Sequence, residues 1–377
     1  MIVTYTTKII VRRYHILVTI SLCMIVKNEE DVIARCLESV KDLVDEINIV
    51  DTGSSDKTKE IVKQFTNRVF DFEWIHHFAE ARNFSFQQAT SDYILWLDAD
   101  DVILAQDQEK FKALKETLSP DIDAVSMNYN LSFDDEGNVS ALLRRYRLVK
   151  RAKQFRWIGA VHEYLEVGGH LFDSDVAVSH LPLHHDHQRN IAIYKKLLQS
   201  GEPLTPRDTF YYANELLDHN EVEEAIFYYE LFLTSKLGWV EDNINACFKL
   251  ADCYSKLHDK ENNVSSILRS FEYDTPRPEA CCRLGYHFME QGKNHEAIFW
   301  YEQALTMKPK PNAPFQNKTF TTWLPHLQLC VLYDRLQQYE LANSHNESAR
   351  VYLPNDPKIL HNKNYFDHLL NKDNSIS

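Results

Sequence analysis

The stretch YILWLDADD at residues 93–101 decides the fold of this chain. An apolar run of strand length ends there in three carboxylates within four residues, Asp98, Asp100 and Asp101. In an open α/β sheet, ligands bind at the carboxyl ends of the strands, so the run predicts a buried parallel strand with a site at its end. Carboxylates this close repel one another unless protons or a cation offset them, and Mg²⁺ or Mn²⁺ prefers such oxygen ligands. The alternative is an acidic loop that caps the next helix.

The residues on either side of this stretch alternate between strand-like and helix-like patterns. Further strands are predicted at 18–26, 46–50 and 68–72, and helices near 29–41, 56–67 and 79–89. This spacing predicts a parallel, doubly wound sheet with crossover helices. From about 123 to 180, shorter strands with polar turns predict a mixed or antiparallel extension of the same sheet, followed by a helix near 188–199.

Two further motifs precede the acidic run. In NIVDTGSSD, residues 48–56, a strand again ends in an acid and a Gly/Ser turn before a helix, which can place Asp51 beside a nucleobase and a helix N-terminus near phosphate. On its own this is also a common strand–turn–helix. In FAEARN, residues 78–83, Arg82 lies on the helix before the acidic strand and could bind a diphosphate. The alternative for Arg82 is an ordinary surface arginine.

The second half of the chain reads as repeated helices. The stretch LGYHFMEQGKNHEAIFWYEQALTMKP, residues 284–309, matches the tetratricopeptide pattern at nearly every signature position. The same register recurs around positions 213, 251 and 330, with an insertion at 309–318. We therefore predict an N-terminal extension at 1–17, an α/β domain at 18–200 and an all-α repeat domain at 201–377. Repeats of this kind indicate architecture and not chemistry.

Composition narrows the class of protein. A length of 377 residues exceeds what one core usually organises, and a net charge of −14 argues against nucleic acid as the main partner. The seven cysteines form no CxxC pair, which favours buried, reduced thiols in a cytoplasmic protein. The apolar run at 16–26 has only 11 residues, too few for a transmembrane segment.

Taken in order, the segments 24–29, 50–56, 81–83 and 97–101 resemble the family 2 inverting glycosyltransferases with the GT-A fold. The resemblance covers about residues 18–185, roughly half of the chain. With its repeat tail, the chain is also similar to the sublancin-type peptide S-glycosyltransferase group. The fold that this implies is a GT-A-type, Rossmann-like mixed-sheet α/β domain followed by an all-α tetratricopeptide-repeat domain.

The resemblance also implies roles for particular residues. The expected donor-binding residues are Val26, Asn28, Asp51, Thr52, Arg82 and Asp98. Asp98 would lie near the ribose or the metal, and Asp100 would be a catalytic residue and the principal ligand of Mg²⁺ or Mn²⁺. Many family members have a second acid where this chain has Thr52, so the resemblance implies the class of donor more firmly than the nucleobase.

The segment GAVHE, residues 159–163, is similar to a G-x-x-H-E segment of this group, and Glu163 is the candidate catalytic base beside His162. A strand-edge acid paired with an arginine of the basic stretch 144–156 is the alternative. That stretch itself could be a solvated strand face or could attract an anionic donor or acceptor. His180 is the first candidate for an additional metal ligand and His184 the second; solvated or packed histidines are the alternative. A separate zinc site is disfavoured because no cysteine lies at ligand spacing.

These expectations describe a metal-dependent glycosyltransferase that moves a sugar from a nucleotide-sugar, with UDP-sugar favoured, to a peptide, protein or glycan acceptor. The repeat domain would hold part of the acceptor and could also support an oligomer. The alternative is a catalytically weak or inactive nucleotide-sugar-binding domain that serves as a platform for repeat-mediated protein interaction. A nucleotidyltransferase is disfavoured because the sequence has no glycine-rich, basic triphosphate loop.

Overall fold

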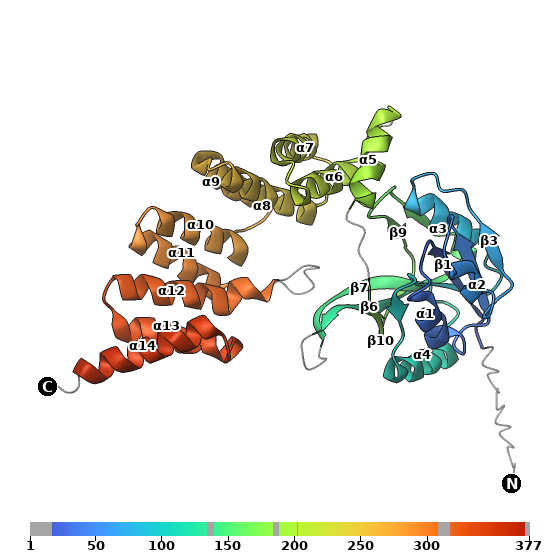
Figure 1. Cartoon of the computed structure of the whole chain (residues 1–377), viewed down its shortest axis with the longest axis horizontal. Coiled ribbons are helices and arrows are strands. Elements are labelled where there is room, and N and C mark those ends of the chain that lie inside the picture. The colour runs from blue at the N-terminus through green and yellow to red at the C-terminus, as the bar shows by residue number, and fades with distance from the viewer. Residues whose placement is uncertain (1–16, 134–138, 184–187, 202, 308–316, 374–377) are drawn as a thin grey trace, which may run out of the picture. The chain divides into compact units, whose positions relative to one another are not determined.

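The computed structural model describes residues 17–133, 139–183, 188–201, 203–307 and 317–373, and the chain divides into two compact units at 200/201 (Figure 1). Apart from Leu17, the expected N-terminal extension at 1–17 lies outside the described residues. Among the helices in these ranges, none has the length and apolar character needed to cross a membrane.

The described part of the first unit is built on an eight-stranded mixed sheet with the order β3-β2-β1-β4-β7-β6-β10-β5. Its strands are β1 (Ile20–Val26), β2 (Glu46–Asp51), β3 (Val69–Asp71), β4 (Tyr93–Trp96), β5 (Asp101–Val102), β6 (Ala124–Phe133), β7 (Val139–Lys150) and β10 (Leu171–His180). Strands β1 to β4 pair in parallel, and β7 joins β4 and β6 antiparallel. The short strands β8 (Arg156–Ile158) and β9 (Tyr164–Glu166) form a separate hairpin. The predicted mixed extension of a parallel sheet is thus confirmed.

Helices cover both faces of this sheet (Figure 1). Residues of β1 alternate between the faces: Ile20, Leu22 and Met24 join one core with residues of three helices, while Cys23 joins the core of α3 on the other face. The helices are α1 (Ile33–Val40), α2 (Thr58–Val62), α3 (Phe78–Gln87), α4 (Ala105–Thr117) and α5 (Arg189–Gln199), and a 3₁₀ turn, η1 (Arg151–Lys153), follows β7. Helix α1 begins four residues later than expected: residues 30–32 form a turn, and the backbone N–H of Glu29 in the preceding loop donates to Thr58 Oγ1.

The second unit consists of successive helix pairs. Its helices are α6 (Pro206–Asp218), α7 (Val222–Ser235), α8 (Val240–Lys256), α9 (Lys260–Arg269), α10 (Pro278–Glu290), α11 (Asn294–Thr306), α12 (Trp323–Arg335), α13 (Tyr339–Tyr352) and α14 (Pro357–Asp373), with 3₁₀ turns η2 (Ser270–Glu272) and η3 (Lys318–Thr321). At Gly285 on α10 an added Cβ would lie 2.8 Å from the ring of Tyr301 on α11, which explains why glycine stands at this repeat position. Most of the insertion expected at 309–318 lies outside the described residues.

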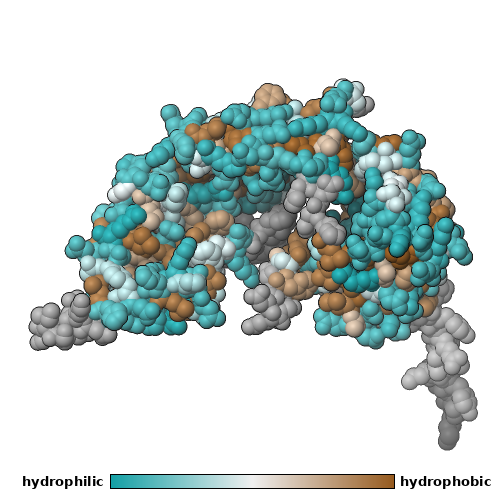
Figure 2. Space-filling model, viewed as in Figure 1, coloured by the Kyte–Doolittle hydropathy of each residue, from teal (hydrophilic) through white to brown (hydrophobic). Residues whose placement is uncertain are grey.

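Burial follows the expected chemistry of the side chains. All seven cysteines are buried and free, as predicted for reduced thiols. The visible surface of each unit is mainly hydrophilic, with apolar residues in scattered groups (Figure 2). Leu237 and Trp239, in the loop between α7 and α8, are examples of exposed apolar residues. Exposed apolar side chains of this kind are common in folded proteins and assign no function.

Candidate active site

The acidic run lies at the carboxyl end of β4, as the sequence predicts. After Trp96 the chain turns through Asp98 and Asp100 into the short strand β5, which begins at Asp101. Strand β5 pairs antiparallel with the end of β10, and this pairing sets Asp101 directly opposite His180. Sheet topology therefore brings together an acid and a histidine that are 79 positions apart in the sequence.

Asp100, Asp101 and His180 form a cluster with metal-ligand character, in which one ligand atom of each lies within 4.8 Å of the others. His180 Nδ1 is 3.4 Å from Asp100 Oδ1 and 3.6 Å from Asp101 Oδ1. The nearby carboxylates of Asp100 and then of Asp101 raise the pKa of His180 to about 10.

A buried oxygen of Asp101 gives a further reason to expect a divalent cation in this cluster. Asp101 is fully buried, and its Oδ1 atom has no hydrogen-bond partner among the described residues. A buried carboxylate oxygen without a partner is costly, and a hard cation is the kind of group that satisfies it. Carboxylate and imidazole are ligands that Mg²⁺, Mn²⁺ and related ions accept.

Asp98 has a different environment from its two neighbours. Its Oδ1 accepts a hydrogen bond of 2.7 Å from Arg82 Nη2, while Arg82 Nε donates to Glu163 Oε1 at 2.6 Å. Although burial opposes ionisation, Arg82 and then Arg147 lower the pKa of Asp98 below its usual range. The cluster with metal-ligand geometry thus contains Asp101 in place of Asp98, so the expected role of Asp98 at a metal stays a prediction.

Arg82 is buried against aromatic rings and does not lie on the surface. Its guanidinium carbon is 4.9 Å from the ring centre of Trp157 and 5.2 Å from that of Trp96. Because its Nε and Nη2 already bind Glu163 and Asp98, a diphosphate would have to share the guanidinium with these acids. The sequence left two roles open for Glu163: the catalytic base, or an acid paired with an arginine of 144–156. Glu163 does pair with an arginine, but that arginine is Arg82.

The segment that carries Glu163 is tied to the helix that carries Arg82. Asn83 donates from Nδ2 to the carbonyl of Trp157 and accepts the N–H of Trp157. At the start of α3, the N–H of Phe78 donates to the carbonyl of Ala160 at 2.8 Å. These bonds explain the FAEARN and GAVHE motifs together: α3 and the 157–163 segment form one scaffold that sets the Arg82–Glu163 contact.

The expected donor-binding residues Val26, Asn28, Asp51 and Thr52 lie together at the carboxyl ends of β1 and β2. Val26 pairs with Asp51 in register, and both the N–H and the hydroxyl of Thr52 donate to the carbonyl of Val26. Asn28 Oδ1 accepts the N–H of Ser55, which links the two loops.

Within these loops, the carboxylate of Asp51 is used by the protein itself. It accepts the N–H groups of Gly53 and Ser54 and pairs with Lys59 at 3.2 Å. Burial opposes ionisation, but the hydrogen bonds from Ser54 and Gly53 lower the pKa of Asp51 overall. Asp51 therefore shapes the loop in this structure, and its expected contact with a donor is not tested.

The sequence did not single out three residues that the structure adds to this site. Arg147 is fully buried and binds Asp101, and Tyr129 contacts His180 Nδ1 through its hydroxyl at 2.9 Å. Glu29 on the β1–α1 loop is half-buried, and burial together with the charge of Asp100 raises its pKa to about 7. Arg147 lies inside the basic stretch 144–156, but nothing in the sequence marks it out from its exposed neighbours.

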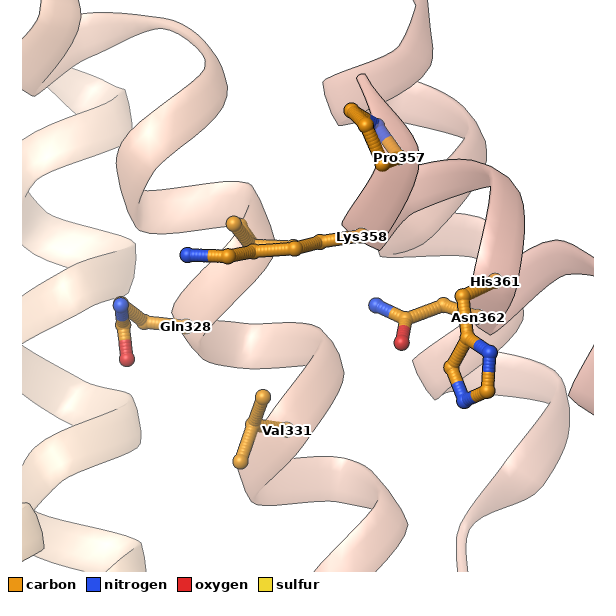
Figure 3. A pocket seen from close by; sticks show the side chains of 7 residues that line it. Gln328, Val331, Pro357, Lys358, His361 and Asn362 are labelled. Carbon is orange, nitrogen blue, oxygen red and sulfur yellow. The ribbon is translucent and has the colours of Figure 1, made fainter.

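One sequence candidate is not described by the structure, and the second unit contains a groove of its own. His184, the second candidate metal ligand, is outside the described residues. A groove of about 480 Å³ lies in the second unit between α12 and α14, where Lys358 extends toward Gln328 (Figure 3). Its lining carries no carboxylate, so it offers no second metal cluster.

Comparison with known proteins finds a separate match for each unit of the chain. Residues 21–166 match the family described as glycosyl transferase family 2, and residues 278–311 match the tetratricopeptide repeat. Residues 21–166 of the first unit are thus similar to glycosyltransferase family 2. The match ends at β9 and includes the acidic run, Arg82 and Glu163, while His180 lies beyond it.

Individual relatives support the same two parts. The SPbeta prophage-derived glycosyltransferase SunS of Bacillus subtilis is 31% identical over 56% of this chain and 52% of its own length, which supports the predicted resemblance to the sublancin-type group. A TPR repeat-containing protein of Synechococcus elongatus is 44% identical over 23% of this chain and 22% of its own length. The chain thus spans about half or less of these relatives. The structure of glucosyl-3-phosphoglycerate synthase from Mycobacterium tuberculosis aligns with a TM-score of 0.34 at 16% identity, over 50% of this chain and 81% of that one.

Proposed function

We propose that this family 2 glycosyltransferase chain transfers a sugar from a nucleotide-sugar, with a UDP-sugar as the first candidate, to a peptide, protein or glycan acceptor. The observation that carries the proposal is the acid–histidine cluster at the carboxyl end of β4, inside a domain of this family. The cluster offers carboxylate oxygens and an imidazole nitrogen at the end of a strand. Such ligands suit a cation that is shared with a diphosphate.

Asp100, Asp101 and His180 would hold Mg²⁺ or Mn²⁺ in this proposal. When bound, such an ion offsets the negative charge that develops on a departing diphosphate. Val26, Asn28, Asp51 and Thr52 would line the nucleoside end of the donor, because their loops meet at the same edge of the sheet.

Glu163 would take the proton of the attacking acceptor group, which an inverting transfer requires of one base. Arg82 Nε donates to its Oε1 atom at 2.6 Å and so fixes the orientation of the carboxylate. The same guanidinium binds Asp98, so Arg82 fixes the distance between the proposed base and the acidic run.

The repeat domain would contribute to acceptor binding. Tetratricopeptide helices stack into surfaces that suit extended chains. The groove between α12 and α14 offers the ammonium of Lys358 and the amides of Gln328 and Asn362 as polar groups for such a ligand (Figure 3).

The test measures release of UDP from UDP-sugars by the full chain, with and without Mn²⁺, and compares wild type with Asp100→Asn. We expect turnover only with the metal, and a loss of about 10²- to 10³-fold in the variant, the range seen when one preorganised stabilising group is removed. Asp42→Asn is the matched control, because it removes the same charge from an exposed site after α1 and should leave turnover unchanged.

Equal turnover in Asp100→Asn and wild type would contradict the assignment of the site. If no nucleotide-sugar is turned over while the chain still binds one, the alternative of an inactive platform for the repeats would replace the proposal. Mass spectrometry of peptides incubated with the active donor would then identify the acceptor class.

A further inference from the structure

Asp101 and Arg147 form a buried ion pair beneath the acidic cluster. Both side chains are fully buried, and Arg147 Nη1 lies 2.9 Å from Asp101 Oδ2. Arg147 comes from β7, the antiparallel neighbour of β4, so the pair links the middle of the sheet to its carboxyl edge.

This pair is poorly suited to a purely stabilising role. Two nitrogens of Arg147, Nε and Nη2, have no hydrogen-bond partner among the described residues. The guanidinium carbon lies instead over two rings, 3.9 Å from the centre of Trp96 and 4.4 Å from that of Tyr129. Burying a guanidinium with so few hydrogen bonds costs free energy that apolar side chains of similar volume would not. A functional reason for the arginine is therefore needed.

The contacts of Asp101 supply that reason, because its two oxygens are in different situations. Oδ2 accepts a hydrogen bond of 3.0 Å from the backbone N–H of Asp98 and forms the ion pair with Arg147 Nη1. Oδ1 has no hydrogen-bond partner and lies toward His180 in the cluster with Asp100. Arg147 thus holds the carboxylate so that a single oxygen remains available.

The number of oxygens that a carboxylate offers matters for the choice of ion. Ca²⁺ takes six to eight oxygen ligands and often binds a carboxylate through both oxygens, whereas Mg²⁺ demands a smaller, octahedral shell. From this we infer that Arg147 is a positioning residue that fixes Asp101 as a one-oxygen ligand and so makes the site select Mg²⁺ or Mn²⁺ over Ca²⁺. The inference rests on the proposed metal site and not on the identity of the sugar or acceptor.

The experiment measures the affinities of the full chain for Mn²⁺ and for Ca²⁺ by calorimetry, without any donor. We expect wild type to bind Mn²⁺ more tightly than Ca²⁺. In Arg147→Met the ratio of the two affinities should fall by about tenfold or more, in line with the effect of groups that orient metal ligands. Arg147→Lys should give an intermediate ratio, because an ammonium does not reproduce the planar guanidinium contact. Arg144→Met, on the same strand but with a half-exposed side chain bound to Ser126, is the matched control and should keep the wild-type ratio.

A purely structural role would lower both affinities together, so an unchanged ratio in Arg147→Met would overturn the inference. If Arg147→Met does not fold, the ratio is measured in Arg147→Lys instead. A wild-type ratio in Arg147→Lys would then overturn the inference. A wild type that binds neither ion overturns it as well, together with the metal in the proposed function. If Arg147→Met shifts the ratio but wild type turns over no nucleotide-sugar, the role of Arg147 is supported. Only the proposed function is then contradicted.

Discussion

Replacing Arg82 by methionine should destabilise the first unit and reveal how strongly this arginine couples two acids. The side chain of Arg82 is 11% exposed and those of Glu163 and Asp98 are 12% and 31% exposed. Removing one partner of a buried ion pair costs about 3–5 kcal/mol, because the other charge stays buried without compensation. Asp98 is nearly one-third exposed and contributes less, so we expect a loss near the lower end, about 3 kcal/mol.

The assay is urea denaturation of the full chain followed by tryptophan fluorescence, reading the transition that shifts between variants. In Arg82→Met/Glu163→Gln the neutral amide no longer needs a cation, so the double variant should recover about 1–2 kcal/mol relative to additivity. Arg156→Met is the control: the Arg156 side chain is exposed, and its loss should cost less than about 1 kcal/mol. A loss below about 1 kcal/mol in Arg82→Met, or additivity within about 0.5 kcal/mol in the double variant, would refute the reasoning.

Two further predictions concern the repeat domain. Gly285→Ala should gain about 1 kcal/mol of helix propensity but lose about 2–3 kcal/mol because its Cβ meets the buried ring of Tyr301. Its urea midpoint should therefore fall, and an unchanged midpoint would contradict this. Burial and the neighbouring His345 lower the pKa of His326 from 6.5 to about 4, while Glu302 opposes the lowering at His345. The unfolded chain therefore binds more protons than the folded one between these values, and the stability of the domain should fall as pH drops from about 6.5 to about 4. His326→Phe should reduce that fall, and an equal fall in the variant would show that other groups cause it.

Local sequence patterns were enough to predict the strands, the repeats and the acidic edge. The run at 93–101 predicted a buried strand with acids at its carboxyl end, and β4 has this arrangement. Cysteines in apolar stretches were likewise predicted to be buried, and they are. Each of these inferences depends on neighbours along the chain.

Contacts between distant side chains could not be predicted in the same way. The pairing of Arg82 with Glu163 spans 81 positions and depends on how the 157–163 segment packs on α3. Arg147 is fully buried although the basic stretch reads as a solvated strand face, because β6 and β10 continue the sheet beyond β7. Asp101 lies beside Asp100 and His180 because β5 pairs with β10. Strand β5 has only two residues, too few for a sequence pattern to predict that pairing.

The two arginines and the acids they bind have different consequences for a cation. Arg82 and Arg147 are both buried, and they pair with Asp98, Glu163 and one oxygen of Asp101. Asp100 and the second oxygen of Asp101 have no arginine partner among the described residues, and the field they create raises the pKa of His180 to about 10. The negative charge that the arginines leave uncompensated is therefore concentrated at one point, between these acids and His180. A divalent cation would be attracted to that point and not to the acidic run as a whole.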